Sequence, residues 1–206
     1  MTRRFQRLAT VPGVSYIGGS EVNQKNLSGN ASEPPVPVGT YEGKREESLS
    51  RTTRDGSTSA SPTQQRNAKP PKNESPAEGA WRQLQERLEL PGTLSDYHFA
   101  IQSCQEELWK LRREEPWVLV RIEELCWLNI RLIEAYPATI AYQTTDGKQL
   151  YARVSAFYRL IYLYEREGFL HEALDVAQRA VRLGNAGNAV ERLQGRLAEL
   201  ATEGEG

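Results

Sequence analysis

The chain has 206 residues, of which 38% are hydrophobic and 26% charged, and a formal net charge of −1, close to an average soluble protein. No window approaches the roughly 18 uninterrupted apolar residues of a membrane span. Two cysteines are too few for a disulfide framework, and no apolar run follows the basic start at 1–4. We therefore expect a reducing, cytoplasmic location and no secretory signal.

The composition changes near residue 77. Residues 1–77 carry 11 Lys or Arg against 7 Asp or Glu and no tryptophan, whereas residues 78–206 carry 15 against 20 and all four tryptophans. Polar residues, Gly and Pro dominate the first part, so it cannot bury enough apolar area to offset the loss of chain entropy. We predict a disordered, mildly basic tail over 1–77, a helical domain over 78–201 and a frayed end over 202–206.

Two helices are predicted directly after the tail. Apolar residues at steps of three and four predict a first helix over 77–90, which Pro91 stops. A second helix begins at a cap, Thr93 or Ser95, and continues to Leu111. Its six apolar positions are too few for a long coiled coil and are typical of a packing seam inside a helical bundle.

A third helix is predicted over 117–136, with Pro116 as its first residue and Pro137 as its end. Its apolar residues spread around most of the circumference, so we expect it to be central and buried on several sides. The pattern assigns no conformation to the connection 138–149, apart from a turn at Asp146.

Two amphipathic helices joined at Gly168 make the clearest pattern in the chain. Apolar residues of the first fall on one face at steps of three and four: Leu150, Val154, Phe157, Leu160, Ile161 and Tyr164. The second ends at Gly184 and has its own apolar stripe: Leu170, Ala173, Leu174, Ala177, Ala180 and Val181. The small alanines let the two antiparallel helices approach closely. A last helix is predicted over 189–201, and we expect it to cover the exposed edge of the helical hairpin.

This helical hairpin resembles the tetratricopeptide repeat, a 34-residue helix–turn–helix unit that stacks into scaffolds. The matching positions are Phe157, Leu160, Tyr164, Gly168, Leu170, Ala173 and Ala180. The departures from the pattern are Ile161, Ala177 and Asn185. The resemblance covers one repeat, about 154–187. It implies an all-α fold of five to six helices in antiparallel hairpins like those of tetratricopeptide repeats.

The sequence shows no constellation of residues that would carry catalysis or bind a metal or cofactor. The only histidines, His98 and His171, have no ligand partner at a useful spacing. Cys104 and Cys126 form no C-x-x-C pair and fall on apolar helix faces. Because no phosphate loop or nucleophile elbow occurs either, we predict that the protein is not an enzyme and needs no cofactor.

The candidate partner-binding residues lie around the first helix of the hairpin: Tyr151, Ser155, Tyr158, Arg159, Tyr162 and Glu165. The three tyrosines form a second aromatic line, roughly 100° from the Phe157 face. In the repeats that the hairpin resembles, Ser155, Tyr158, Tyr162 and Glu165 match positions that line an inner groove, which implies that a peptide or helix binds there. In an equally open alternative, the tyrosines pack against the third helix.

At two of these groove positions the chain has tyrosine where repeats that clamp a carboxylate have Lys and Asn, which argues against recognition of an acidic C-terminus. We predict a protein–protein interaction module: an adaptor, a regulatory subunit or an assembly component.

Two rival hypotheses stay open. The first is nucleic-acid association through the basic tail, using Arg3, Arg4, Arg7, Lys44 and Arg45. The second is an enzyme with a site assembled from scattered polar residues around Glu123, Glu124 and Arg153.

Overall fold

The computed structural model describes most of the helical part of the chain and three strands nearer the N-terminus. The described residues are 36–38, 48–53, 56–60, 63, 71–88 and 93–203. The chain divides into two compact units, with the boundary between Thr139 and Ile140. The domain bounds drawn from the sequence, 1–77, 78–201 and 202–206, stay a prediction.

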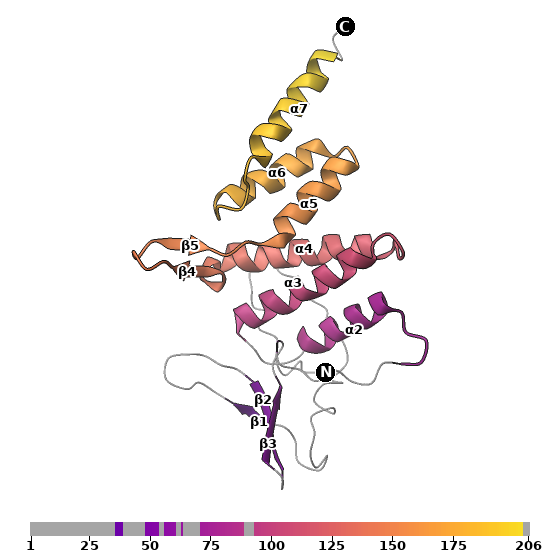
Figure 1. Ribbon diagram of the computed structural model, residues 1–206, viewed down its shortest axis with the longest axis vertical. Helices are drawn as coiled ribbons and strands as arrows, with labels where there is room; N and C mark the ends of the chain where they lie inside the picture. Colours follow the sequence, from indigo (N-terminus) through magenta and orange to yellow (C-terminus); the bar gives the residue numbers. More distant parts are fainter. Residues whose placement is uncertain are drawn as a thin grey trace. The chain divides into compact units, whose positions relative to one another are not determined.

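Three short strands form an antiparallel sheet in the order β1-β2-β3 (Figure 1). They are β1 (Val36–Val38), β2 (Ser48–Thr53) and β3 (Gly56–Ala60). Val36 pairs with Ser50, and Thr53 pairs with Gly56. Pro37 lies on β1, an edge strand, which is where sheets tolerate proline. The β-branched Val and Thr residues of these strands favour extended backbone. The expectation of a disordered tail over 1–77 stays a prediction.

Helices α2 and α3 begin at the residues that their capping chemistry selects. In α2 (Pro76–Leu88), the Ser75 hydroxyl accepts from the Glu78 N–H, and the Glu78 carboxylate accepts from the Ser75 N–H. In α3 (Leu94–Leu111), Thr93 and Asp96 make the same reciprocal pair. Both helices confirm the predicted positions, and Thr93 is the cap.

The third helix, α4 (Val118–Ala135), begins two residues after Pro116 and so later than predicted. It is followed by the 3₁₀ turn η2 (Pro137–Thr139). α3 packs between α2 and α4 in this unit (Figure 1). Eight residues of α4 are buried: Val118, Ile122, Leu125, Cys126, Asn129, Ile130, Leu132 and Ile133. Val120 is 59% exposed, so the expectation of burial nearly all round fails on that side of the helix.

A β-hairpin opens the second unit, in the connection that the sequence pattern leaves unassigned. Strands β4 (Ala141–Gln143) and β5 (Gln149–Tyr151) pair antiparallel. The turn confirms the expected signal, since Gly147 has a φ of 79° that favours glycine. Leu150 and Tyr151 therefore lie on a strand and not on the following helix. The Thr144 N–H donates to the Lys148 carbonyl at 2.9 Å and closes the hairpin.

Three further helices complete this unit: α5 (Ser155–Arg166), α6 (Leu170–Val181) and α7 (Ala189–Glu203). α6 packs against both α5 and α7 (Figure 1). Gly168 and Gly184 have φ values of 84° and 61°, so both helices end as predicted, at residues in the left-handed region.

The small residues of α6 face the interior of this unit, where Ala173, Ala177 and Ala180 are fully buried. They pack in a core with Phe157, Leu160, Val176 and Leu193, all of them also fully buried. Val181, expected on the same stripe, is instead 55% exposed. Over 71–88 and 93–203, no helix is both long and apolar enough to cross a membrane.

Candidate functional site

The outward side of α5 carries the candidate residues that lie on that helix. Ser155 is followed by Tyr158 and Arg159 three and four residues later, and Tyr162 follows these two by four and three residues, so all four lie on the side away from the buried Phe157. Tyr162 is 46% exposed, whereas Tyr158 is half-buried. An aromatic ring with this exposure covers apolar surface and keeps its hydroxyl in water, as interface tyrosines do.

Two arginines hold the first turns of this side in place. The Arg153 guanidinium lies 4.4 Å from the centroid of the Tyr158 ring, within the range of a cation–π contact. Nη1 of Arg159 donates to the Ser155 hydroxyl at 2.6 Å. Tyr158 and Ser155 are thus each paired with a cationic side chain.

Glu165 connects α5 to α7. Its carboxylate accepts hydrogen bonds from Arg192 and from Arg196, the latter at 2.6 Å. Burial alone would disfavour the charged carboxylate. The hydrogen bonds and charges of the two guanidinium groups outweigh burial, and the pKa of Glu165 lies below its ordinary value.

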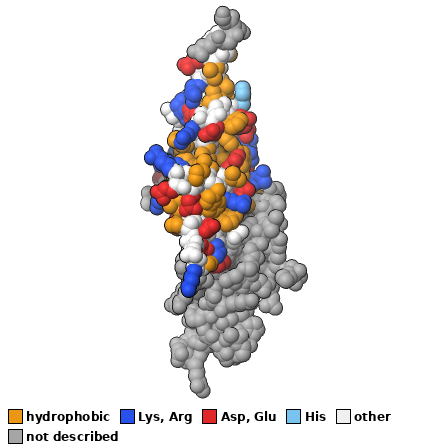
Figure 2. Space-filling view, turned by 90° about the vertical axis from the view of Figure 1, so that its right-hand side faces the viewer, with side chains coloured by type: hydrophobic (Ala, Val, Ile, Leu, Met, Phe, Trp, Pro, Cys, Tyr) orange, Lys and Arg blue, Asp and Glu red, His pale blue; other side chains and the backbone are white. Residues whose placement is uncertain are grey.

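Together these residues define the α5–α7 face: Arg153, Ser155, Tyr158, Arg159, Tyr162, Glu165, Arg166, Arg192 and Arg196. Arg166 lies 11 residues after Ser155, which is three helical turns further along the same side of α5. On the part of the surface that Figure 2 shows, hydrophobic side chains alternate with Lys, Arg, Asp and Glu over the described residues.

Sequence reasoning missed Arg192 and Arg196, although a signal was present. Arg192 follows Tyr158, and Arg196 follows Tyr162, by 34 residues. This distance equals one tetratricopeptide-repeat length. Extending the resemblance by one repeat would have pointed to both arginines.

Tyr151 does not belong to the helical side. It lies on β5, and its hydroxyl accepts from Nε2 of Gln149 at 3.1 Å. The aromatic line expected along one helix is therefore reduced to Tyr158 and Tyr162. The alternative in which these two pack against the third helix stays a prediction.

The residues of the two rival hypotheses are distributed over both units and over parts of the chain that the structure does not describe, so both hypotheses stay predictions. Glu124 pairs with Arg121 on α4, their side chains 2.7 Å apart and largely exposed, and Glu123 is half-buried on the same helix. Arg153 belongs to the other unit. Residues 3, 4, 7, 44 and 45 lie outside the described part. Among the described residues, no group of His, Cys, Asp and Glu could hold a metal ion.

The histidine and cysteines of the first unit lie in its interior. Nδ1 of His98 is 2.7 Å from the Asn129 Oδ1, and burial lowers the pKa of His98 despite this hydrogen bond. The Cys104 thiol donates to the Ala80 carbonyl at 3.5 Å, and burial raises its pKa to about 12. Cys126 is also buried, and it forms no disulfide among the described residues. Thiols in such surroundings are inert at neutral pH.

No protein-family model matches the chain, and no curated protein or solved structure matches it either. The architecture alone therefore classifies the described part: six helices follow one another in sequence, and successive helices pack antiparallel within each unit.

Proposed function

We propose that this chain is a protein–protein interaction module and that its α5–α7 face contacts the partner. The observation that carries the proposal is Tyr162, which is 46% exposed on α5, with Arg159 and Arg166 one helical turn to either side of it. Tyr and Arg are the side chains most enriched, with Trp, among residues that dominate binding energy at interfaces. A tyrosine on a helix loses little conformational entropy when a partner covers it, because only two side-chain torsions become fixed.

We further propose that α5 and α6 form a unit like a tetratricopeptide repeat and that α7 takes the place of the first helix of a following unit. Three features support this: the αL glycine between α5 and α6, the buried alanines of α6, and the 34-residue spacing between the α5 tyrosines and the α7 arginines. In such an array, α5 and α7 lie next to each other along one groove. The Glu165 contacts with Arg192 and Arg196 support that placement. The partner would then bind as an extended segment or a helix along the groove.

Site-specific photo-crosslinking tests the proposal. A photoreactive amino acid replaces Tyr162 on α5 in one variant and Tyr142 on β4 in another. Tyr142 is a matched control because it is an exposed tyrosine of the same unit, at 51%. After irradiation of intact cells, we expect a discrete adduct from position 162 and none from 142. Equal adducts from both positions, or none from 162, would rule out the proposed face.

A further inference from the structure

The cationic side chains of the second unit are concentrated on one face. Residues 140–206 contain 8 Lys or Arg and 9 Asp or Glu, so this segment is nearly neutral. Five of those eight cations belong to the α5–α7 face: Arg153, Arg159, Arg166, Arg192 and Arg196. The carboxylates on the same sides of the two helices, among the side chains that the structure describes, are Glu165 and, one turn beyond Arg196, Glu199. Glu165 therefore supplies the negative charge at the contact between α5 and α7, in the region between Tyr162 and Arg192.

Glu165 cannot neutralise the two arginines that it binds. Its single carboxylate accepts from Arg192 and Arg196, whose side chains are 41% and 45% exposed. A guanidinium has five N–H donors in a fixed plane, so each arginine keeps donors beyond the one directed at Glu165. The shape of the guanidinium suits bidentate pairing with a second carboxylate. Glu165 thus holds both arginines in position for an incoming anion.

We propose that the partner segment bound by the α5–α7 face is acidic. This inference rests on the proposed function and specifies the chemistry of its partner. Side-chain carboxylates of the segment pair with Arg166, Arg192 and Arg196, while an apolar residue between them covers the Tyr162 ring.

The inference is tested with the full chain and synthetic peptides. One labelled peptide alternates Glu with Leu, and a matched peptide of equal length alternates Lys with Leu. Both have blocked ends, so neither carries a terminal carboxylate. In fluorescence anisotropy, we expect the acidic peptide to bind and the basic one not to bind, and we expect added salt to weaken binding by screening the charges. Equal binding of the two peptides, or no binding of either, would overturn the inference.

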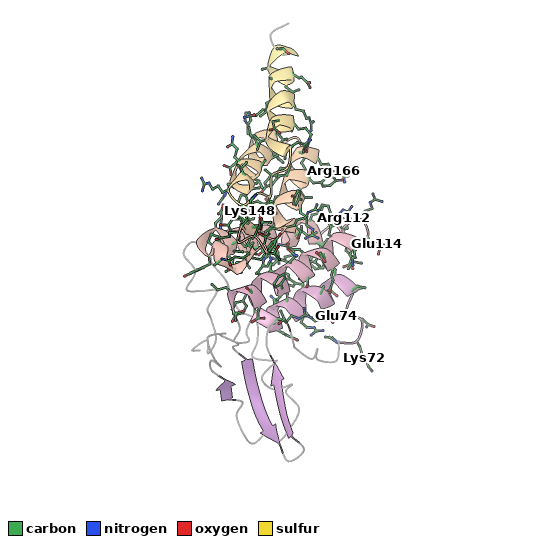
Figure 3. The ribbon with its side chains drawn as sticks, turned by 60° about the vertical axis from the view of Figure 1, so that its left-hand side comes forward. Lys72, Glu74, Arg112, Glu114, Lys148 and Arg166 are labelled. Atoms are coloured by element: carbon green, nitrogen blue, oxygen red, sulfur yellow. The ribbon has the colours of Figure 1, made fainter. Side chains whose placement is uncertain are left out.

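Charge-reversal variants locate the site. Arg166 at the end of α5 and Lys148 in the β4–β5 hairpin are exposed cations on different elements (Figure 3). Arg166→Glu should weaken binding of the acidic peptide at least about 10-fold, and Arg196→Gln should weaken it in the same direction. Lys148→Glu should leave it unchanged. Circular dichroism verifies that each variant keeps its helices. Equal effects of Arg166→Glu and Lys148→Glu would contradict the inference.

The same variants separate this inference from the proposed function. If the adduct at position 162 persists in Arg166→Glu and Arg196→Gln with undiminished yield, the face binds a partner that is not acidic. The proposed function then stands and this inference falls. If position 162 forms no adduct even in the otherwise unchanged chain, the proposed function itself fails.

Discussion

Asn185 shows how one buried polar side chain joins two stretches of backbone. Its Oδ1 accepts from the Val154 N–H at 2.7 Å, and its Nδ2 donates to the carbonyls of Leu183 and Ala152 at 2.7 and 3.3 Å. The residue is 2% exposed, so water cannot replace these bonds. Asn185 departs from the repeat pattern because its amide links the start of α5 to the end of α6, which a proline could not do.

Asn185→Ala should therefore lower the free energy of unfolding by about 2–3 kcal/mol, since it leaves a buried N–H and a buried carbonyl without partners. Gln178→Ala is the control. Gln178 is exposed within α6, and its truncation should change stability by less than about 0.5 kcal/mol. Urea denaturation followed by circular dichroism measures both. Similar losses in the two variants would show that the Asn185 hydrogen bonds contribute no net stability.

His98 should make the stability of the chain depend on pH. Its pKa in the folded protein is below the ordinary 6.5 because burial disfavours the imidazolium. As the pH falls through about 6.5, the unfolded chain binds a proton at this site and the folded chain does not, so stability is lost toward lower pH. His98→Gln should remove this part of the loss between pH 7 and 5. His171→Gln, at the exposed histidine, should retain it. An unchanged pH profile in His98→Gln would contradict the assignment.

At the scale of single residues, the sequence predicted which side chains are buried better than it predicted which side chains form ion pairs. Cys104 and Cys126 lie in the interior as their helix faces indicated. The pairing of Glu165 with Arg192 and Arg196 depends on two helices meeting, and no local pattern in α5 specifies it. Tyr151 was misplaced because Leu150 and Tyr151 fit the period of a helix and that of a short strand equally well.

Substitutions of glycine at a helix end and inside a helix test how far local backbone conformation determines where the helices end. Gly168→Ala should destabilise the chain by about 1–2 kcal/mol, because φ is 84° at this position and a Cβ is strained there. Gly195→Ala is the control with the opposite expected sign, since Gly195 lies inside α7 and a Cβ added there would meet no other atom within 4 Å. It should stabilise the chain by roughly 0.5–1 kcal/mol. Thermal unfolding compares the two, and a shift in the same direction for both would contradict this account.

Helix positions could be predicted because caps, glycines and apolar periods act over a few residues. The first helix was expected over 77–90 and spans Pro76–Leu88, and the last was expected over 189–201 and spans Ala189–Glu203. The β4–β5 hairpin could not be predicted in the same way. Its strands have three residues each, too few for an alternating pattern to show.

At the scale of the whole molecule, the net charge did not indicate that arginines gather on the α5–α7 face. Residues 78–206 carry a net charge of −5, which gave no reason to expect an acidic partner. The arginines of the α5–α7 face become neighbours only when α6 packs between α5 and α7. Net charge describes solubility and long-range steering, whereas the chemistry of a site depends on which side chains the fold brings together.

The central claim is that the α5–α7 face binds a partner, and the most direct test compares Tyr162→Ala with Tyr142→Ala. The partner is the protein that forms an adduct at position 162, and its affinity is measured by titration alongside thermal unfolding of each variant. Tyr162→Ala should weaken binding by about 10-fold or more, with a melting temperature close to that of Tyr142→Ala. Unchanged affinity in Tyr162→Ala, or a loss of about 3–5 kcal/mol in stability like that of a core truncation, would contradict the claim.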